Sequence, residues 1–292
     1  MNKVNRFLVV GGDSLIGTHL AEQLKKHGEV ISTTRRNSVA NQISLDLESL
    51  DIKSLLSLAP DIVFICAGLT NIKDCEADPQ GARRINVEGT LSLAKAMVSI
   101  GCFVVFLSSN TVFNCLTPYP NEDLQPSPQI EYGKQKVDTE AGLLSLSGAT
   151  DHVAIVRLSK VVTGGGGIAG EFIRRLKNRE QLIAFEDLLL SPVTLEYVCE
   201  SLIDIALRKL SGIFHISGNW ELSYAEFATK LAEAMNVSTD RILPSHSDAV
   251  GINVIFRPRH PALGMSRTRE ILGRDPQPLS AVINQLLLVK YE

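Results

Sequence analysis

Cysteine and basic charge are both scarce in this chain of 292 residues. Its five cysteines include no Cys-x-x-Cys pair, and their odd number argues against a closed set of disulfides, so we expect a reduced, cytoplasmic compartment. The 29 Lys and Arg residues are fewer than the 32 Asp and Glu residues, which leaves no basic excess for binding nucleic acid. The six histidines show no His-x-x-His or His-Glu-x-x-His spacing, so we expect no metal site.

Long hydrophobic runs are also few. Residues 96–121 carry no charge, but Gly101 interrupts them, and the polar residues Ser108 and Asn110 follow. We therefore expect a helix end, a buried strand and a loop in this region, and no membrane span. The apolar run at 7–10 is too short for a signal peptide. With 45% apolar residues, the chain can still bury a large core, which excludes disorder.

Short apolar runs alternate with helix-length segments in the first 160 residues. The runs that we expect to form strands are 7–10, 29–34, 42–47, 61–66, 102–108 and 152–158. Because these runs are almost continuously apolar, they are typical of parallel strands buried on both faces. The pattern predicts an α/β fold with a Rossmann-like doubly wound parallel sheet in residues 1–160. Residues 161–292 have shorter helices, and predict a smaller α+β substrate lobe interleaved with the sheet domain.

The sequence VVGGDSLIG at 9–17 lies between the first expected strand and the first expected helix. Gly11 would form a tight turn, Ser14 stands where dinucleotide-binding loops often have a glycine, and Gly17 would allow close packing of helix on sheet. Backbone N–H groups at the helix start, helped by the Ser14 hydroxyl, would bind a pyrophosphate. The residues assigned to this loop are Gly11, Asp13, Ser14, Leu15, Ile16 and Gly17. A glycine-rich turn without a ligand is the alternative.

The second expected strand indicates which nucleotide the site prefers. An NAD site would have an acidic residue about 20 residues after the first glycine, where it would bind the ribose 2′-hydroxyl. Residues 32–38 contain no acid, whereas Arg35 and Arg36 suit a 2′-phosphate. We therefore favour NADP(H) over NAD(H), with two solvated surface arginines as the alternative.

Tyr132 and Lys136 are four residues apart on an expected helix, so their side chains share one face. A nearby ammonium lowers the pKa of a phenol, so we expect Tyr132 to titrate below its usual range and to act as an acid/base. Ser109 follows the fifth expected strand, and strand ends of a doubly wound sheet meet at the ligand crevice. Taken alone, each of these residues also fits an ordinary helix face or cap.

The motifs GGDSLIG (11–17), SSNTVF (108–113) and YGKQK (132–136) together resemble those of the extended short-chain dehydrogenases/reductases. The chain is similar to the dTDP-4-dehydrorhamnose reductase branch of that family nearly from end to end. The resemblance implies a catalytic set of Ser109, Tyr132 and Lys136. It also implies cofactor contacts at Asp46, Leu47, Cys66, Ala67 and Gly68. The implied activity is NADPH-dependent reduction of the C4 ketone of a nucleotide-linked deoxysugar, in a possible homodimer.

The chain departs from that branch beside the expected substrate. The family usually has Thr-Asp-Tyr where this chain has Ser109, Asn110 and Thr111, which leaves the identity of the ketosugar open. On the substrate side we expect Thr70, Asn110, Thr111 and Arg257, the last as a clamp on a nucleoside diphosphate. The alternatives are an NAD(P)-dependent sugar-nucleotide epimerase or dehydratase on the same scaffold, and a non-catalytic NADP-binding regulatory subunit.

Overall fold

The computed structural model describes residues 5–36, 42–146 and 151–288 of the chain. It forms two compact units, each assembled from several segments. The first unit consists of Met1–Phe113, Pro126–Arg157 and Cys199–Phe214, and the second of Asn114–Gln125, Leu158–Val198 and His215–Glu292.

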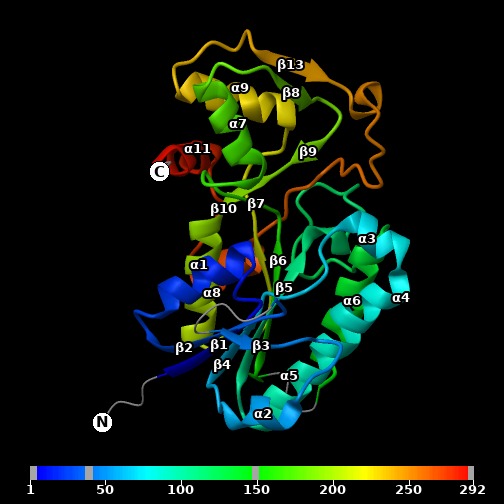
Figure 1. Cartoon of the computed structure of the whole chain (residues 1–292), viewed down its shortest axis with the longest axis vertical. Helices are drawn as coiled ribbons and strands as arrows, with labels where there is room; N and C mark the ends of the chain where they lie inside the picture. Colours follow the sequence, from blue (N-terminus) through cyan, green and yellow to red (C-terminus); the bar gives the residue numbers. More distant parts are fainter. Residues whose placement is uncertain (1–4, 37–41, 147–150, 289–292) are drawn as a thin grey trace. The chain divides into compact units, whose positions relative to one another are not determined.

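A seven-stranded sheet organises the first unit (Figure 1). In spatial order its strands are β11 Gly212–Ile216, β6 Val153–Leu158, β5 Phe103–Ser109, β4 Ile62–Ile65, β1 Asn5–Val10, β2 Gly28–Thr34 and β3 Gln42–Ser44. The pairs from β5 to β3 are parallel. The expected doubly wound α/β fold is confirmed, because the order runs outward from β1 in both directions. The third strand is shorter than the expected 42–47 and ends at Ser44.

Helices cover both faces of this sheet: α1 and α8 lie on one face, and α5 and α6 on the other (Figure 1). The helices before β6 are α1 Leu15–Leu24, α2 Ile52–Ser57, α3 Ile72–Ala77, α4 Pro79–Arg83, α5 Thr90–Ser99 and α6 Glu131–Leu144. α8 (Leu195–Leu207) begins in the second unit and continues into the first. A π-helical turn, η1 (Arg84–Gly89), lies between α4 and α5.

The second unit has three two-stranded sheets and four helices of its own among the described residues. Its strands pair as β10 Pro192–Thr194 with β7 Lys160–Val162, β12 Leu222–Ser223 with β9 Leu189–Leu190, and β13 Ile242–Ser245 with β8 Leu182–Phe185. Its helices are α7 Gly167–Lys177, α9 Tyr224–Ala234, α10 Ser266–Leu272 and α11 Leu279–Leu288. A capping box between Ser223 and Glu226 begins α9.

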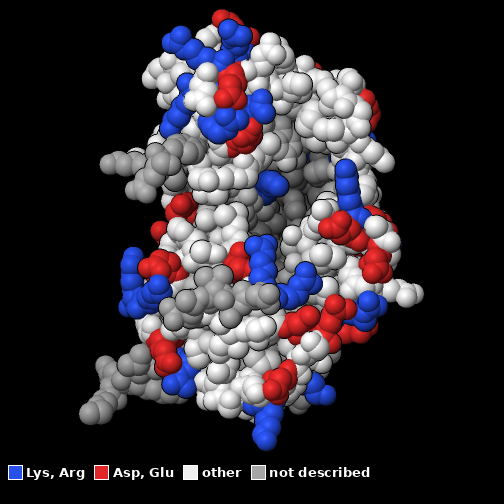
Figure 2. Space-filling model, in the orientation of Figure 1, with Lys and Arg blue, Asp and Glu red and all other residues white. Residues whose placement is uncertain are grey.

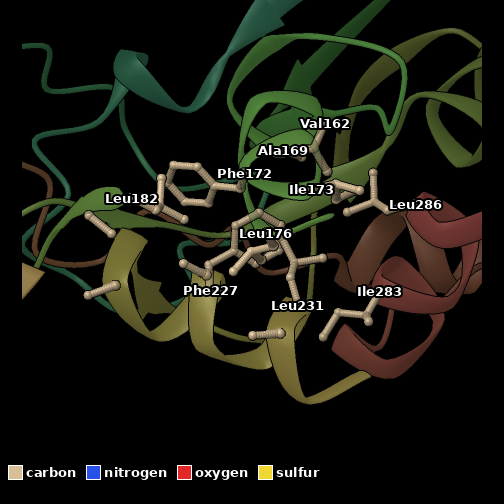
Figure 3. Close-up of a cluster of buried hydrophobic side chains, with 14 of the residues drawn as sticks. Val162, Ala169, Phe172, Ile173, Leu176, Leu182, Phe227, Leu231, Ile283 and Leu286 are labelled. Atoms are coloured by element: carbon tan, nitrogen blue, oxygen red, sulfur yellow. The ribbon is translucent and has the colours of Figure 1, made fainter. Parts of the chain in front are cut away.

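The core of the second unit lies between α7, α9 and α11 (Figure 3). Phe172 of α7 packs against Phe227 of α9 with ring centroids 6.4 Å apart. Leu176, Leu231 and Leu286 fill the space around them. Each such buried apolar side chain contributes about 1.5–3 kcal/mol relative to an exposed one, so this unit has a stabilising core of its own.

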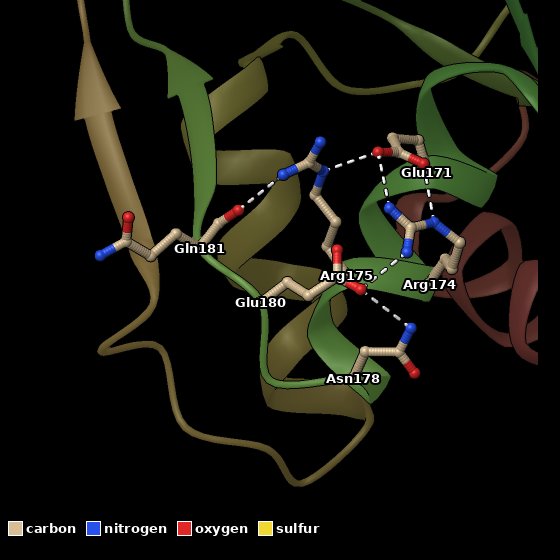
Figure 4. Close-up of polar contacts among 6 residues, drawn as sticks. All are labelled: Glu171, Arg174, Arg175, Asn178, Glu180 and Gln181. Atoms are coloured by element: carbon tan, nitrogen blue, oxygen red, sulfur yellow. Dashed lines mark hydrogen bonds and ion pairs between the residues drawn. The ribbon is translucent and has the colours of Figure 1, made fainter.

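Charged side chains of both signs are interspersed on the face seen in Figure 2. At the end of α7, Arg174 bridges Glu171 and Glu180, while Arg175 pairs with Glu171 (Figure 4). Hydrogen bonds from Arg174 and Arg175 hold the pKa of Glu171 at about 2. Among the described residues, no helix combines the length and the apolar character that a membrane crossing requires.

Candidate functional site

The glycine turn between β1 and α1 leaves no room for side chains at two of its positions. Gly11 has a φ of +83°, and a Cβ there would lie 2.7 Å from the backbone N of Ala67. A Cβ at Gly17 would lie 2.1 Å from the Gly11 carbonyl oxygen. Only glycine therefore allows the turn, the start of α1 and the loop after β4 to approach this closely. The result is a cradle of backbone groups at a helix N-terminus, which fits a dinucleotide pyrophosphate.

Ser14 caps α1 instead of pointing its proton into the cradle. Its hydroxyl donates to the Gly11 carbonyl oxygen over 2.7 Å and accepts from the Gly17 N–H over 3.1 Å. This differs from our expectation of a hydroxyl donor for phosphate, because the single hydroxyl proton is already used within the turn. An anion in this cradle would therefore be bound by backbone N–H groups. Leu15 and Ile16 supply the first of these, since the first N–H groups of a helix have no partner within it.

A cavity of about 250 Å³ opens beside this turn, entirely within the first unit. Residues assigned from the sequence that line it are Gly11, Asp13, Ser14, Arg35, Arg36, Asp46, Leu47, Cys66, Ala67 and Gly68. Leu15, Ile16 and Gly17 were also assigned but do not line it. Val10, Thr33, Leu45, Leu69 and Ile85 line it and were missed. The cavity thus follows the carboxyl ends of β1, β2 and β4, where doubly wound sheets bind nucleotides.

Two arginines lie at the β2 side of this cavity. The Arg36 side chain is 84% exposed, and its Nε lies 3.6 Å from Asp13 Oδ2. Thr33 fastens the same strand end to the glycine turn, because its hydroxyl accepts from the Gly11 N–H over 3.3 Å. Arg35 and Arg36 are therefore exposed cations at the rim of the cavity, and Thr33 holds the strand that carries them.

Ser109 ends β5 and begins the short 3₁₀ turn η2 (Asn110–Val112). Its Oγ accepts from the Thr111 N–H over 3.2 Å and from the Thr111 hydroxyl over 3.0 Å. The Ser109 proton is donated to Asn110 Oδ1 at 3.3 Å, a long bond. Thr111 thus occupies the lone pairs of Ser109, and a substrate carbonyl oxygen would compete with Asn110 Oδ1 for the Ser109 proton.

Tyr132 and Lys136 lie on α6 in the same unit. Lys136 Nζ donates to the Leu107 carbonyl oxygen of β5 over 2.8 Å and lies 5.6 Å from the centre of the Tyr132 ring. Gly133 allows this approach, because a Cβ there would lie 2.2 Å from the Thr111 carbonyl oxygen. The helix face that carries Tyr132 and Lys136 is therefore packed directly against the turn that carries Ser109.

Burial changes the titration of both residues. It lowers the pKa of Lys136 to about 8, and it raises the pKa of Tyr132 above its usual value. Our expectation of a lowered Tyr132 pKa was wrong, because desolvation of the buried phenolate is the main influence on its pKa. The i, i+4 spacing places the two groups on one face, but it carries no information about how deeply they are buried.

A buried amide connects the cavity to helix α6. Asn86, on the π-helical turn η1, accepts from the Leu69 N–H over 2.7 Å and donates to the Leu69 carbonyl oxygen over 2.9 Å. Its amide also donates to Gln135 of α6 over 2.8 Å. Asn86 is not among the residues expected at the site from the sequence. In the structure Asn86 lies on a π-helical turn, a feature that often marks a functional site. A hydrophobic pattern in the sequence does not reveal such a turn.

The remaining substrate candidates are dispersed. Thr70 is exposed on the loop after β4 in the first unit. Arg257 is in the second unit, where Asp187 and Asp248 both pair with it. Its guanidinium also donates to the Ser247 hydroxyl over 3.1 Å. A diphosphate clamp at Arg257 would therefore compete with two carboxylates that already neutralise it.

The sheet order, the glycine turn and the Ser–Tyr–Lys set in one unit define an extended short-chain dehydrogenase/reductase. More narrowly, the chain belongs to the RmlD substrate binding domain family, which it matches over residues 5–289.

The chain matches proteins named as reductases and proteins named as a methionine adenosyltransferase subunit. A dTDP-4-dehydrorhamnose reductase of Sinorhizobium fredii is 28% identical over 250 residues, covering 82% of each protein. Methionine adenosyltransferase 2 subunit beta of Xenopus laevis is 25% identical over 304 residues, covering 97% of this chain and 87% of the relative. The crystal structure of dTDP-4-dehydrorhamnose reductase from Bacillus anthracis in complex with NADP has a TM-score of 0.85 at 21% identity, covering 99% of this chain and 100% of that one. That structure establishes likeness of fold.

Proposed function

We propose that the protein catalyses the NADPH-dependent reduction of the C4 ketone of a nucleotide-linked deoxysugar. The observation that carries this proposal is the hydrogen bond from Lys136 Nζ to the carbonyl oxygen of Leu107 in β5, two residues before Ser109. This contact holds Ser109 and the Tyr132 face of α6 together in one unit. Cys66 lines the cavity and lies near Lys136, which supports a reacting centre at the inner end of the cavity.

The residues that would hold the cofactor are the backbone of the glycine turn and the two arginines at the rim. When bound, the nicotinamide supplies the hydride. Ser109 donates a hydrogen bond to the ketone oxygen and polarises the carbonyl, and Tyr132 transfers its phenol proton to the same oxygen as the hydride reaches C4. Lys136 is charged below a pH of about 8, and its positive charge favours proton loss from Tyr132 at that moment.

The decisive experiment follows NADPH absorbance with purified protein and a panel of dTDP-, UDP- and GDP-linked 4-ketosugars. We expect turnover with at least one member of the panel. If no member is reduced while NADPH still binds, the proposed activity is wrong. The second candidate, a non-catalytic NADP-binding subunit, would then be favoured, because the chain also matches a methionine adenosyltransferase subunit over 97% of its length.

Replacing both rim arginines, as Arg35→Ala/Arg36→Ala, is expected to weaken NADPH binding about 10- to 100-fold, because at this exposed rim their hydrogen bonds to the 2′-phosphate together contribute about 1.5–3 kcal/mol, the value of one charge-assisted hydrogen bond. NADH binding should change little, since NADH has no 2′-phosphate. Isothermal titration calorimetry with both cofactors measures the effect. Arg83→Ala is the matched control, because Arg83 is a half-exposed arginine of the same unit that pairs with Asp138. Equal losses for NADPH and NADH would contradict a 2′-phosphate site.

Thr111→Val is expected to lower kcat/KM about threefold to tenfold, the value of a neutral hydrogen bond. Valine keeps the shape of the side chain but removes the hydroxyl that donates to Ser109 Oγ, so the serine proton is no longer directed toward the substrate. The control is Thr229→Val in α9, which removes a hydroxyl that donates to the Ala225 carbonyl oxygen. Steady-state kinetics that give equal values for the two variants would exclude this role of Thr111.

A further inference from the structure

The most deeply buried charges of the first unit have no part in the proposed chemistry. Arg157 of β6 and Glu140 of α6 are 1% and 2% exposed. The Arg157 guanidinium donates to Glu140 through Nη2 over 2.7 Å and through Nε over 3.1 and 3.2 Å. Arg157 also stacks on Phe113, with 5.1 Å from its guanidinium carbon to the ring centre. A buried pair contributes little net stability compared with apolar residues of the same size, so its presence points to another role.

Glu140 connects this pair to the catalytic elements. Tyr132, Lys136 and Glu140 are four residues apart in succession, so they share one face of α6. On β5, Leu107 accepts from Lys136 over 2.8 Å, and the next residue, Ser108, donates its hydroxyl to Glu140 over 2.5 Å. Two consecutive residues of β5 are therefore fastened to two consecutive turns of α6. Ser109, which carries the proposed catalytic hydroxyl, is the next residue along β5.

Four titratable groups face the Lys136 ammonium from the elements packed around it. Tyr132 and Glu140 are on α6, Cys66 is on the loop after β4, and Cys75 is on α3. Glu140 makes the largest favourable electrostatic contribution, which opposes the cost of burying the ammonium. The thiols contribute less, and burial raises the pKa of Cys66 to about 12, so that thiol stays neutral at working pH.

We propose that Glu140 is a positioning residue, which keeps Lys136 charged and seated on β5 and is itself held in place by Arg157 and Ser108. This inference rests on the proposed function only for its effect on turnover. Its effect on Lys136 exists in the protein without cofactor or substrate.

The test compares wild type with Glu140→Gln/Arg157→Met. The double variant removes both charges of the buried pair together. Glu140→Gln alone would leave the Arg157 charge buried without its carboxylate partner. A second variant, Glu140→Asp, keeps a carboxylate for Arg157 but withdraws it from Lys136 by one methylene. Asp138→Asn is the matched control, because it removes a half-exposed acid of the same helix that pairs with Arg83.

The first measurement is an NMR titration of the lysine side-chain nitrogens in the cofactor-free proteins. We expect the Lys136 midpoint to fall by on the order of one pH unit in the double variant, by less in Glu140→Asp, and not at all in the control. The second measurement is the pH profile of NADPH turnover. The rate depends on charged Lys136, so the decline at high pH should begin at lower pH in both variants.

A folded double variant or a folded Glu140→Asp variant with the wild-type Lys136 midpoint would overturn the inference and leave the proposed reaction intact. A lowered midpoint together with no wild-type turnover of any ketosugar would support the inference and count against the proposed reaction. The two failures are therefore distinguishable.

Discussion

Tyr132→Phe is expected to lower NADPH turnover about 10²- to 10⁴-fold, the usual contribution of a general acid or base. Phenylalanine keeps the ring that faces Lys136 at 5.6 Å and removes only the hydroxyl that delivers the proton. The variant should therefore fold, and it should bind NADPH as tightly as wild type. Calorimetric titration with NADPH measures binding. Single-turnover kinetics with the ketosugar that the wild-type protein reduces measures the chemical step.

The control for this variant is Tyr224→Phe. Tyr224 is a half-buried tyrosine in the second unit that packs edge-on against Phe172, and burial raises its pKa as it does that of Tyr132. Losing this hydroxyl removes a similar polar group without touching the Ser–Tyr–Lys set. If Tyr132→Phe and Tyr224→Phe keep the same turnover, another group protonates the substrate and Tyr132 has only a structural role.

The sheet and the glycine turn could be predicted from the sequence because each has a local cause. Strands such as Ile62–Ile65 are apolar at every position, as burial on both faces requires, and Gly11 and Gly17 stand where a Cβ would meet backbone atoms. Thr33 and Ile85 were missed because their place on the cavity wall depends on how distant segments meet. Neither residue type indicates a nucleotide site by itself.

Electrostatic expectations were less reliable than geometric ones. The spacing of Tyr132 and Lys136 correctly places both on one face, but the sign of the Tyr132 pKa shift depends on burial, which is a property of the assembled core. Ser14 illustrates the same limit, because a serine at this position can cap the helix or contact a ligand, and the backbone geometry decides between them. Arg257 is a third case. Its partner Asp187 is distant in the sequence and its partner Asp248 is separated from it by a loop, so the sequence does not show that they pair with it.

Gly133→Ala is expected to lower kcat about 100-fold, because a misplacement of about 1 Å at a reacting centre costs that much. Alanine favours a helix over glycine by about 1 kcal/mol, so propensity alone predicts a more stable α6. The added Cβ, however, would lie 2.2 Å from the Thr111 carbonyl oxygen, and this backbone atom cannot rotate away. Helix α6 must then move from η2, which separates Tyr132 from Ser109.

The matched control is Gly142→Ala, nine residues further along the same helix. There the new Cβ would meet the side-chain carbons of Leu91 at 2.6 and 2.7 Å, and a leucine side chain can change rotamer. Both variants gain the same helix propensity, so thermal unfolding and kcat together separate stability from geometry. We expect Gly142→Ala to keep its activity and Gly133→Ala to lose it while still binding NADPH. Wild-type kcat in Gly133→Ala would mean that the close contact between α6 and η2 does not set the position of the proton donor.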